Sequence, residues 1–184
     1  SNICTTETLT LTANGIGACS TSTVSDALTL TLNCLPPNLG TVGGNAIVCQ
    51  GTSSVVYTVP VNSNVLTYNW QVPTGATIIS GQGTNAITVD WGGVSAIYLN
   101  AIEVIESNAA GCLGTPVLLD VFVLALSGNN VGPFCPGDPS TALVGSPAGG
   151  TWSGTGVTGN NFDPTVGIGN YVLTYSLAGC TTAI

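Results

Sequence analysis

Strict alternation between apolar and polar residues is the feature of this 184-residue chain that most limits its fold. The segments TLTLTA (8–13) and ALTLTLN (27–33) alternate without a break. Because successive side chains of a strand point to opposite faces, this pattern predicts strands with one buried face. Further segments rich in β-branched and aromatic residues also have the composition of strands: VVYTV (55–59), LTYNWQV (66–72), ATIIS (76–80), AITVDW (86–91), IYLNAIEVIE (97–106), VLLDVFVLAL (117–126) and NYVLTYSL (170–177). Turn signals separate them and helical patterns are almost absent, so the sequence predicts an all-β chain of β-sandwiches.

Two linkers divide the chain. NCLPPNLG (33–40) contains a Pro-Pro pair that favours extended backbone, and SGNNVGP (127–133) is short and polar. We therefore predict three parts. Residues 1–34 form the C-terminal hairpin of a preceding repeat, residues 35–126 form a complete sandwich, and residues 127–184 form a further repeat without its last strand. The two terminal parts hold too few strands for complete domains.

The charged residues exclude several classes of function. The chain has eight Asp and Glu residues but no Lys, Arg or His, which gives a net charge of −8. Without cations it cannot neutralise the phosphates of nucleic acids or attract anionic lipid headgroups. Neither a Ser–His nor a Ser–Lys pair can form, and there is no lysine for a Schiff base, so we predict that the protein is not an enzyme. No apolar run reaches the ~18 residues of a membrane helix, so no membrane insertion is expected.

Seven cysteines are spread widely along the chain. With no histidine and no C-x-x-C spacing, zinc binding is disfavoured. Wide spacing in a chain rich in Thr, Ser and Gly favours disulfides and an oxidising, extracellular setting. The odd number leaves at least one thiol free, or paired outside this sequence.

The segment GTGVTG (154–159) matches the G-x-G-x-x-G pattern that binds dinucleotides. That pattern works only between a strand and a helix, where backbone N–H groups face the pyrophosphate. The residues that follow, NNFDPTVG, are poor helix formers, and the chain has no cation to hold a phosphate. We therefore interpret GTGVTG as a glycine-rich turn between strands.

The order of motifs in the middle part is characteristic. CQGT (49–52) precedes the strand VVYTV, a strand with a central tryptophan, Trp70, begins YNWQVPTGATIISGQGTNAITVDWG (68–92), and NAAGC (108–112) closes the unit. This order resembles the PKD-like domains that occur in tandem in very large secreted surface proteins of gliding bacteria. The resemblance covers nearly all of the middle part. The strand IYLNAIEVIE is longer and more apolar than is usual in that family.

The outer parts resemble Ig-like repeats of the same kind of protein. Residues 134–180 contain, in order, a cysteine, a GGTWSG turn, FDP, YVLTY and a closing Gly-Cys, while residues 8–32 resemble the final hairpin of another repeat. The resemblance implies the disulfides Cys49–Cys112 and Cys135–Cys180, each closing one domain. It leaves Cys19 to seek a partner upstream. Cys4 and Cys34 could bridge if their strands are neighbours, but the sequence does not fix this.

Two binding chemistries remain as alternatives. Calcium binds through carboxylate and backbone oxygens, and the weak candidates are Asp90, Glu103, Glu106 and Asp120. Because no calcium-loop motif is present, acids in solvent or capping turns are the favoured interpretation, and no cofactor is expected. The tryptophans Trp70, Trp91 and Trp152 could line a sugar-binding platform, but core packing is favoured, most of all for Trp70 in its strand.

These observations lead to one main functional hypothesis. The resemblance implies a stalk segment of a large adhesin or filament on the cell surface, exported by type IX secretion and used in attachment or gliding motility. Its expected partners are neighbouring repeats or copies, with a surface polysaccharide or other cell-surface ligand as a further partner. The alternatives are a filament or sheath subunit that assembles by strand addition, since open sheet edges invite such pairing, and a carbohydrate-binding module.

Overall fold

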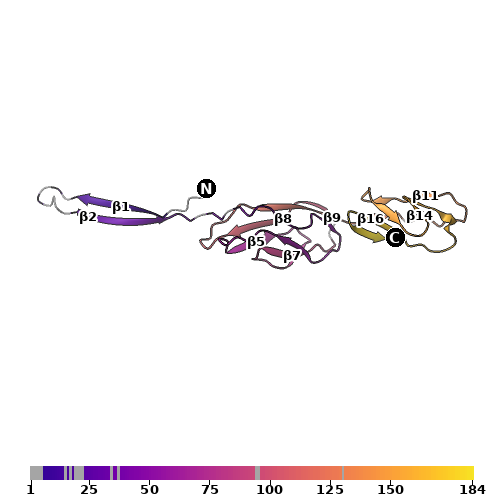
Figure 1. Ribbon diagram of the computed structural model, residues 1–184, viewed down its shortest axis with the longest axis horizontal. Coiled ribbons are helices and arrows are strands. Elements are labelled where there is room, and N and C mark those ends of the chain that lie inside the picture. The colour runs from indigo at the N-terminus through magenta and orange to yellow at the C-terminus, as the bar shows by residue number, and fades with distance from the viewer. Residues whose placement is uncertain are drawn as a thin grey trace.

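The computed structural model describes residues 6–14, 16, 18, 23–33, 35–36, 38–93, 96–129 and 131–184. Over these residues the regular elements are strands together with a short 3-10 helix, η2 (Pro164–Val166). The all-β prediction is therefore confirmed. Figure 1 shows three bodies in a row: a two-stranded hairpin, a middle sandwich and a smaller C-terminal module.

The N-terminal hairpin pairs β1 (Thr6–Asn14) with β2 (Thr23–Thr31) in antiparallel register. Directly opposed residues share a face of the hairpin, so the register separates two kinds of side chain. One face carries the pairs Leu9–Leu28 and Leu11–Asp26, while the other carries pairs such as Thr8–Thr29. The described residues of both strands are exposed, so the leucine face of this hairpin is open to solvent.

The middle sandwich is made of two sheets, ordered β3-β9-β8-β5 and β4-β7-β6. The strands are β3 (Ile47–Cys49), β4 (Val55–Thr58), β5 (Thr67–Gln71), β6 (Thr77–Ser80), β7 (Ala86–Asp90), β8 (Ala96–Ser107) and β9 (Val117–Leu124). Alternating residues of β4, β5 and β7 are buried, as the period-2 pattern predicts. Four strands facing three is the arrangement of an Ig-like sandwich.

Aromatic residues fill the core between these sheets. Trp70, Trp91 and Tyr57 are all at most 2% exposed. The Trp70 indole N–H donates to the carbonyl oxygen of Thr84 at 2.8 Å, and that of Trp91 donates to the Tyr57 hydroxyl at 3.2 Å. Their polar atoms are thus satisfied inside the protein, which removes the cost of burying them.

The long strand β8 is interrupted by an irregularity where its pairing with β9 shifts, between Tyr98 and Ile102. Asn100 adopts a positive φ of 53° there, and its backbone N–H donates to Asp120 of β9 at 2.7 Å. The irregularity interrupts the regular pairing of this twelve-residue strand with β9.

The C-terminal module contains three small sheets around a separate core of Leu143, Trp152, Phe162, Leu173 and Tyr175. Its strands are β10 (Ser127–Gly128), β11 (Thr141–Ala142), β12 (Gly145–Ser146), β13 (Thr151–Ser153), β14 (Val157–Thr158), β15 (Asn161–Phe162), β16 (Thr174–Leu177) and β17 (Cys180–Ala183). The predicted strand 170–177 begins only at Thr174. GTGVTG lies between β13 and β15, with β14 inside it, and no α-helix follows, so it is a turn-rich connection as interpreted.

A glycine in the turn between β6 and β7 offers a test of this fold. A Cβ on Gly81 would lie 2.0 Å from the carbonyl oxygen of Ala86, whereas a Cβ on Gly51 would meet no heavy atom within 4 Å. Both residues have a positive φ, +90° and +80° respectively. Gly51→Ala should lower the free energy of unfolding by about 1 kcal/mol through backbone strain alone, and Gly81→Ala by about 2 to 4 kcal/mol, because the turn must also move. Urea unfolding of the two variants measures this, and equal losses would contradict the packing of this turn.

Candidate functional site

A disulfide joins the middle sandwich to the C-terminal module. Cys49 ends β3 in the sandwich, and Cys180 begins β17 in the module. Their Cα atoms are 5.4 Å apart, and the bond closes a loop across a sequence separation of 131 residues. The chain-entropy model assigns about 5 kcal/mol of stabilisation to a loop of this length.

The peptide connection between the two bodies runs beside this bond. β3 pairs with β9 in parallel, and Cys49 lies opposite Leu124, the last residue of β9. The backbone N–H of Gln50 donates to the carbonyl oxygen of Leu124 at 2.8 Å. Only residues 125–126 separate β9 from β10, and Leu126 packs against the core of the C-terminal module. Two covalent connections therefore cross from one body to the other side by side, and we call this place the joint.

The predicted disulfides Cys49–Cys112 and Cys135–Cys180 are wrong. Cys49 lies at the C-terminal end of β9 and Cys112 precedes its N-terminal end, so ~23 Å of strand separates them, far beyond the reach of a disulfide. Cys112, half-buried, and Cys135, exposed, are both free thiols. The predicted connections of Cys4, Cys19 and Cys34 lie outside the described residues.

The resemblance implies cysteine pairs within single domains, so it does not predict the joint. Cys49 and Cys180 belong to different cores, and nothing in their spacing distinguishes a bond between bodies from a bond within one. The available signal was weak: both cysteines stand at an end of a short strand-like segment. Strand direction, which the sequence does not give, decides which ends meet.

The structure does not bring the four calcium candidates together. Asp90 lies on β7 in one sheet, Glu103 and Glu106 lie on β8 in the other, and Asp120 lies on β9. Among the residues that the structure describes, no three His, Cys, Asp or Glu side chains gather closely enough to hold a metal ion.

Two of these carboxylates instead accept hydrogen bonds from the backbone. The Asp90 carboxylate accepts from the N–H of Gly92 at 2.7 Å, and that of Asp120 accepts from Asn100. In the C-terminal module, Asp138 and Asp163 accept in the same way from Cys135 and Thr165. The hydrogen bonds from Thr165 lower the pKa of Asp163. The interpretation of these acids as caps of turns is confirmed for Asp90, Asp138 and Asp163, whereas Asp120 accepts across the sheet from the irregularity of β8.

Glu106 is different, because it is a carboxyl group buried in the sandwich. It is 1% exposed, and its Oε2 atom has no hydrogen-bond partner. The chain folds over it at Gly114, whose N–H donates to the Glu106 carbonyl at 2.8 Å. A Cβ on Gly114 would lie 2.6 Å from the Cγ atom of Glu106. Burial without a cation raises the pKa of this carboxyl and favours its neutral form.

The tryptophans do not form a sugar-binding platform. Trp70, Trp91 and Trp152 are 2%, 0% and 6% exposed, so none offers a face to solvent. The core interpretation of Trp70 is confirmed, and Trp91 is equally buried. A carbohydrate-binding module based on these three side chains is therefore excluded.

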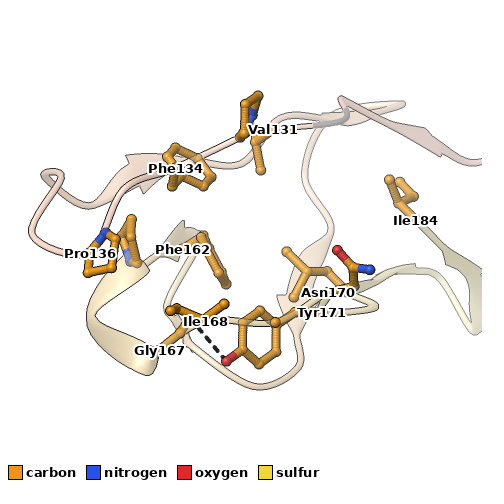
Figure 2. Close-up of a pocket in the computed structure, with 14 residues that line it drawn as sticks. Val131, Phe134, Pro136, Phe162, Gly167, Ile168, Asn170, Tyr171 and Ile184 are labelled. Atoms are coloured by element: carbon orange, nitrogen blue, oxygen red, sulfur yellow. Dashed lines mark hydrogen bonds between the residues drawn. The ribbon is translucent and has the colours of Figure 1, made fainter.

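An apolar groove lies in the C-terminal module and has a volume of about 420 Å³. Figure 2 shows Phe134, Phe162 and Tyr171 around it, together with Ile168. The Tyr171 hydroxyl donates to the carbonyl oxygen of Gly167 at 3.3 Å, which ties the loop that carries Ile168 to the wall of the groove. Ile168 is 95% exposed. The side chains that line it are mainly apolar and none is charged, although backbone groups and Asn170 add polar surface.

Comparison with known proteins locates one domain of known type. The family model of the PKD-like domain matches residues 35–119. This range holds the whole of β3 to β8 and the start of β9, so the middle sandwich is similar to PKD-like domains, as the motif order implied. A search of curated proteins found no match. Tandem repetition and type IX secretion stay predictions.

Two observations bear on the compartment. PKD-like domains are typically extracellular, and the Cys49–Cys180 disulfide indicates an oxidising environment. In the described part of the chain, no helix is long and apolar enough to cross a membrane.

The buried carboxyl predicts a dependence of stability on pH. The folded pKa of Glu106 is raised, so at a pH below its unfolded pKa both states are protonated and its contribution to stability is complete. As the pH rises towards the folded pKa, the unfolded state loses its proton first and this contribution falls, by up to about 1.4 kcal/mol per pH unit. Glu106→Gln, which stays neutral, should therefore gain stability relative to the parent as the pH rises from about 4 to about 8.

Urea unfolding of the parent and the variant over this pH range measures the difference. Glu103→Gln is the matched control, because Glu103 lies on the same strand but is only partly buried. If the difference between the parent and Glu106→Gln did not change with pH, the Glu106 carboxyl would not be held neutral in the fold.

Proposed function

We propose that this chain is a stalk segment of an extracellular adhesin or filament on the cell surface, serving attachment or gliding motility. The joint is the observation that carries the proposal. Two β modules placed end to end and linked by both a peptide and a disulfide suit a part that spans distance and bears tension. In this role the chain is not an enzyme and needs no cofactor.

Other features support the same role. The middle sandwich is similar to PKD-like domains, which are extracellular and structural or adhesive in type. The lack of Lys and Arg removes every site at which a trypsin-like protease could cut, an advantage for an exposed stalk. The proposed partners are neighbouring modules of the same kind, and a surface polysaccharide or another cell-surface ligand is the proposed target of attachment. We further propose that the protein is exported by type IX secretion.

Labelling of intact cells tests the proposed location and role. Antibodies raised against residues 35–184 should bind cells whose envelope is intact, and an in-frame deletion of these residues should reduce attachment or gliding. An antibody against a cytoplasmic protein is the control for envelope integrity. Labelling that needs permeabilised cells, or unchanged attachment and gliding in the deletion strain, would refute the proposal.

A second candidate function is self-assembly into a filament, and the N-terminal hairpin favours it. Leu9, Leu11 and Leu28 lie on one face and are 60%, 74% and 61% exposed. A two-stranded hairpin is at best marginally stable alone, so contact of its leucine face with another protein surface would stabilise it. We propose that this leucine face docks against the apolar groove in the C-terminal module of a second copy. The hairpin and the groove lie on bodies at opposite ends of the molecule, so one copy can contact the next in this way. Head-to-tail contacts of this kind produce open filaments.

Sedimentation velocity of the whole chain tests this assembly. The parent should associate as its concentration rises, more strongly in high salt, because each copy carries a net charge of −8 that salt screens. Leu9→Thr combined with Leu28→Thr should abolish association, while the matched change Thr8→Ser with Thr29→Ser on the opposite face should preserve it. A parent that stays monomeric at all salt concentrations, or a leucine variant that associates as well as the parent, would exclude this contact.

A further inference from the structure

The Cys49–Cys180 disulfide changes the covalent path through the molecule. A chain that enters the middle sandwich along β3 reaches Cys49 and can cross directly to Cys180, from which β17 runs towards residue 184. Residues 50–179 form a loop that the Cys49–Cys180 bond closes. They include β4 to β16, so most of both cores belongs to the loop.

Tension along a chain follows the covalent backbone and any crosslink that shortens it. A load applied to the chain before Cys49 and after Cys180 must pass through the disulfide, because the loop offers only a longer, slack route between the same two residues. The Cα atoms of the two cysteines are 5.4 Å apart in the fold, and they stay within the short reach of a disulfide for as long as the bond is intact.

Beyond the N-terminal hairpin of β1 and β2, which precedes the two modules on the entry side, only short described elements of the modules lie on the loaded path. On the entry side they are β3, which is three residues long, and the preceding chain that places Leu39 and Val42 in the sandwich core. On the exit side the loaded element is β17, which pairs with β16. These elements can detach from their neighbours without drawing out the chain of the loop.

We infer that the disulfide is a mechanical bypass, which carries tension past residues 50–179 and leaves most of the sandwich and most of the C-terminal module unloaded. The bypass explains how the proposed stalk would bear tension, and its biological purpose depends on that proposed function. A stalk with this connection keeps its folded surface under a pull that would otherwise extend both modules.

Single-molecule force spectroscopy tests the bypass by length. Handles are attached at the two ends of the chain in a Cys112→Ser, Cys135→Ser background, which removes both described free thiols and prevents exchange with them. With the disulfide intact, the loop should release no length. In the further variants Cys49→Ser and Cys180→Ser, unfolding should release an additional 430 to 470 Å, about 3.3 to 3.6 Å for each of the 131 residues spanned.

Reduction under load gives a second readout that does not depend on how well the serine variants fold. At a constant force, dithiothreitol should cleave the bond in one step, followed by release of the same length, and the cleavage rate should rise with the applied force. A bond outside the loaded path would be cleaved at a rate independent of force. Release of the loop length before reduction, or a cleavage rate that ignores the force, would overturn the inference.

These measurements separate the bypass from the proposed function. The length and rate readouts concern the isolated chain, so they stand even if the protein proves not to be a surface stalk. Conversely, surface labelling and attachment could be as proposed while the loop extends under load, and the bypass alone would then fail.

Discussion

The complete lack of positively charged side chains is the constraint on which the rest of this structure depends. Elsewhere, carboxylates near a protein surface are commonly balanced by Lys or Arg. In this protein main-chain N–H groups replace those cations as partners of the carboxylates. Four carboxylates each accept a hydrogen bond from a main-chain N–H: those of Asp90, Asp120, Asp138 and Asp163. The acids are thereby used at turns and at the irregularity of β8, where main-chain donors are unpaired by the sheets. Glu106 differs from these four, because its Oε2 atom is buried without a hydrogen-bond partner and burial raises its pKa.

The same constraint shapes the cores. The polar atoms of the buried aromatic side chains in the sandwich are satisfied by neutral hydrogen bonds, such as those from Trp70 to Thr84 and from Trp91 to Tyr57. Tyr57 in turn donates to the carbonyl oxygen of Asn45 at 3.0 Å, and burial raises its pKa to about 12. In the C-terminal module the Tyr175 hydroxyl accepts from Gly150 and donates to Pro147. Because no interior contact depends on an ion pair, salt should affect contacts between molecules more than it affects the fold.

Features that depend on local pattern could be predicted from the sequence, and features that depend on the arrangement of strands could not. Alternation of side chains revealed β1, β2 and most strands of the sandwich, and the central position of Trp70 in its strand indicated its burial. The two-residue strands β10, β11, β12, β14 and β15 are too short to leave a periodic signal. The pairing of Cys49 with Cys180 depends on β3 lying parallel to β9 and on which module follows, and neither is a local property. The burial of Glu106 likewise depends on the fold of the chain around Gly114.

The disulfide beside the two-residue peptide between β9 and β10 changes how freely the two modules can move relative to each other. Modules tied by a single flexible linker can swivel, and the average span of such a chain grows only with the square root of its length. Two tethers side by side restrict bending and twisting between the bodies that they connect. In an array of such units the end-to-end distance would grow in proportion to the number of units, as it does in a rod. Each added unit would then lengthen the array by a full module, so its reach would be set by the number of units.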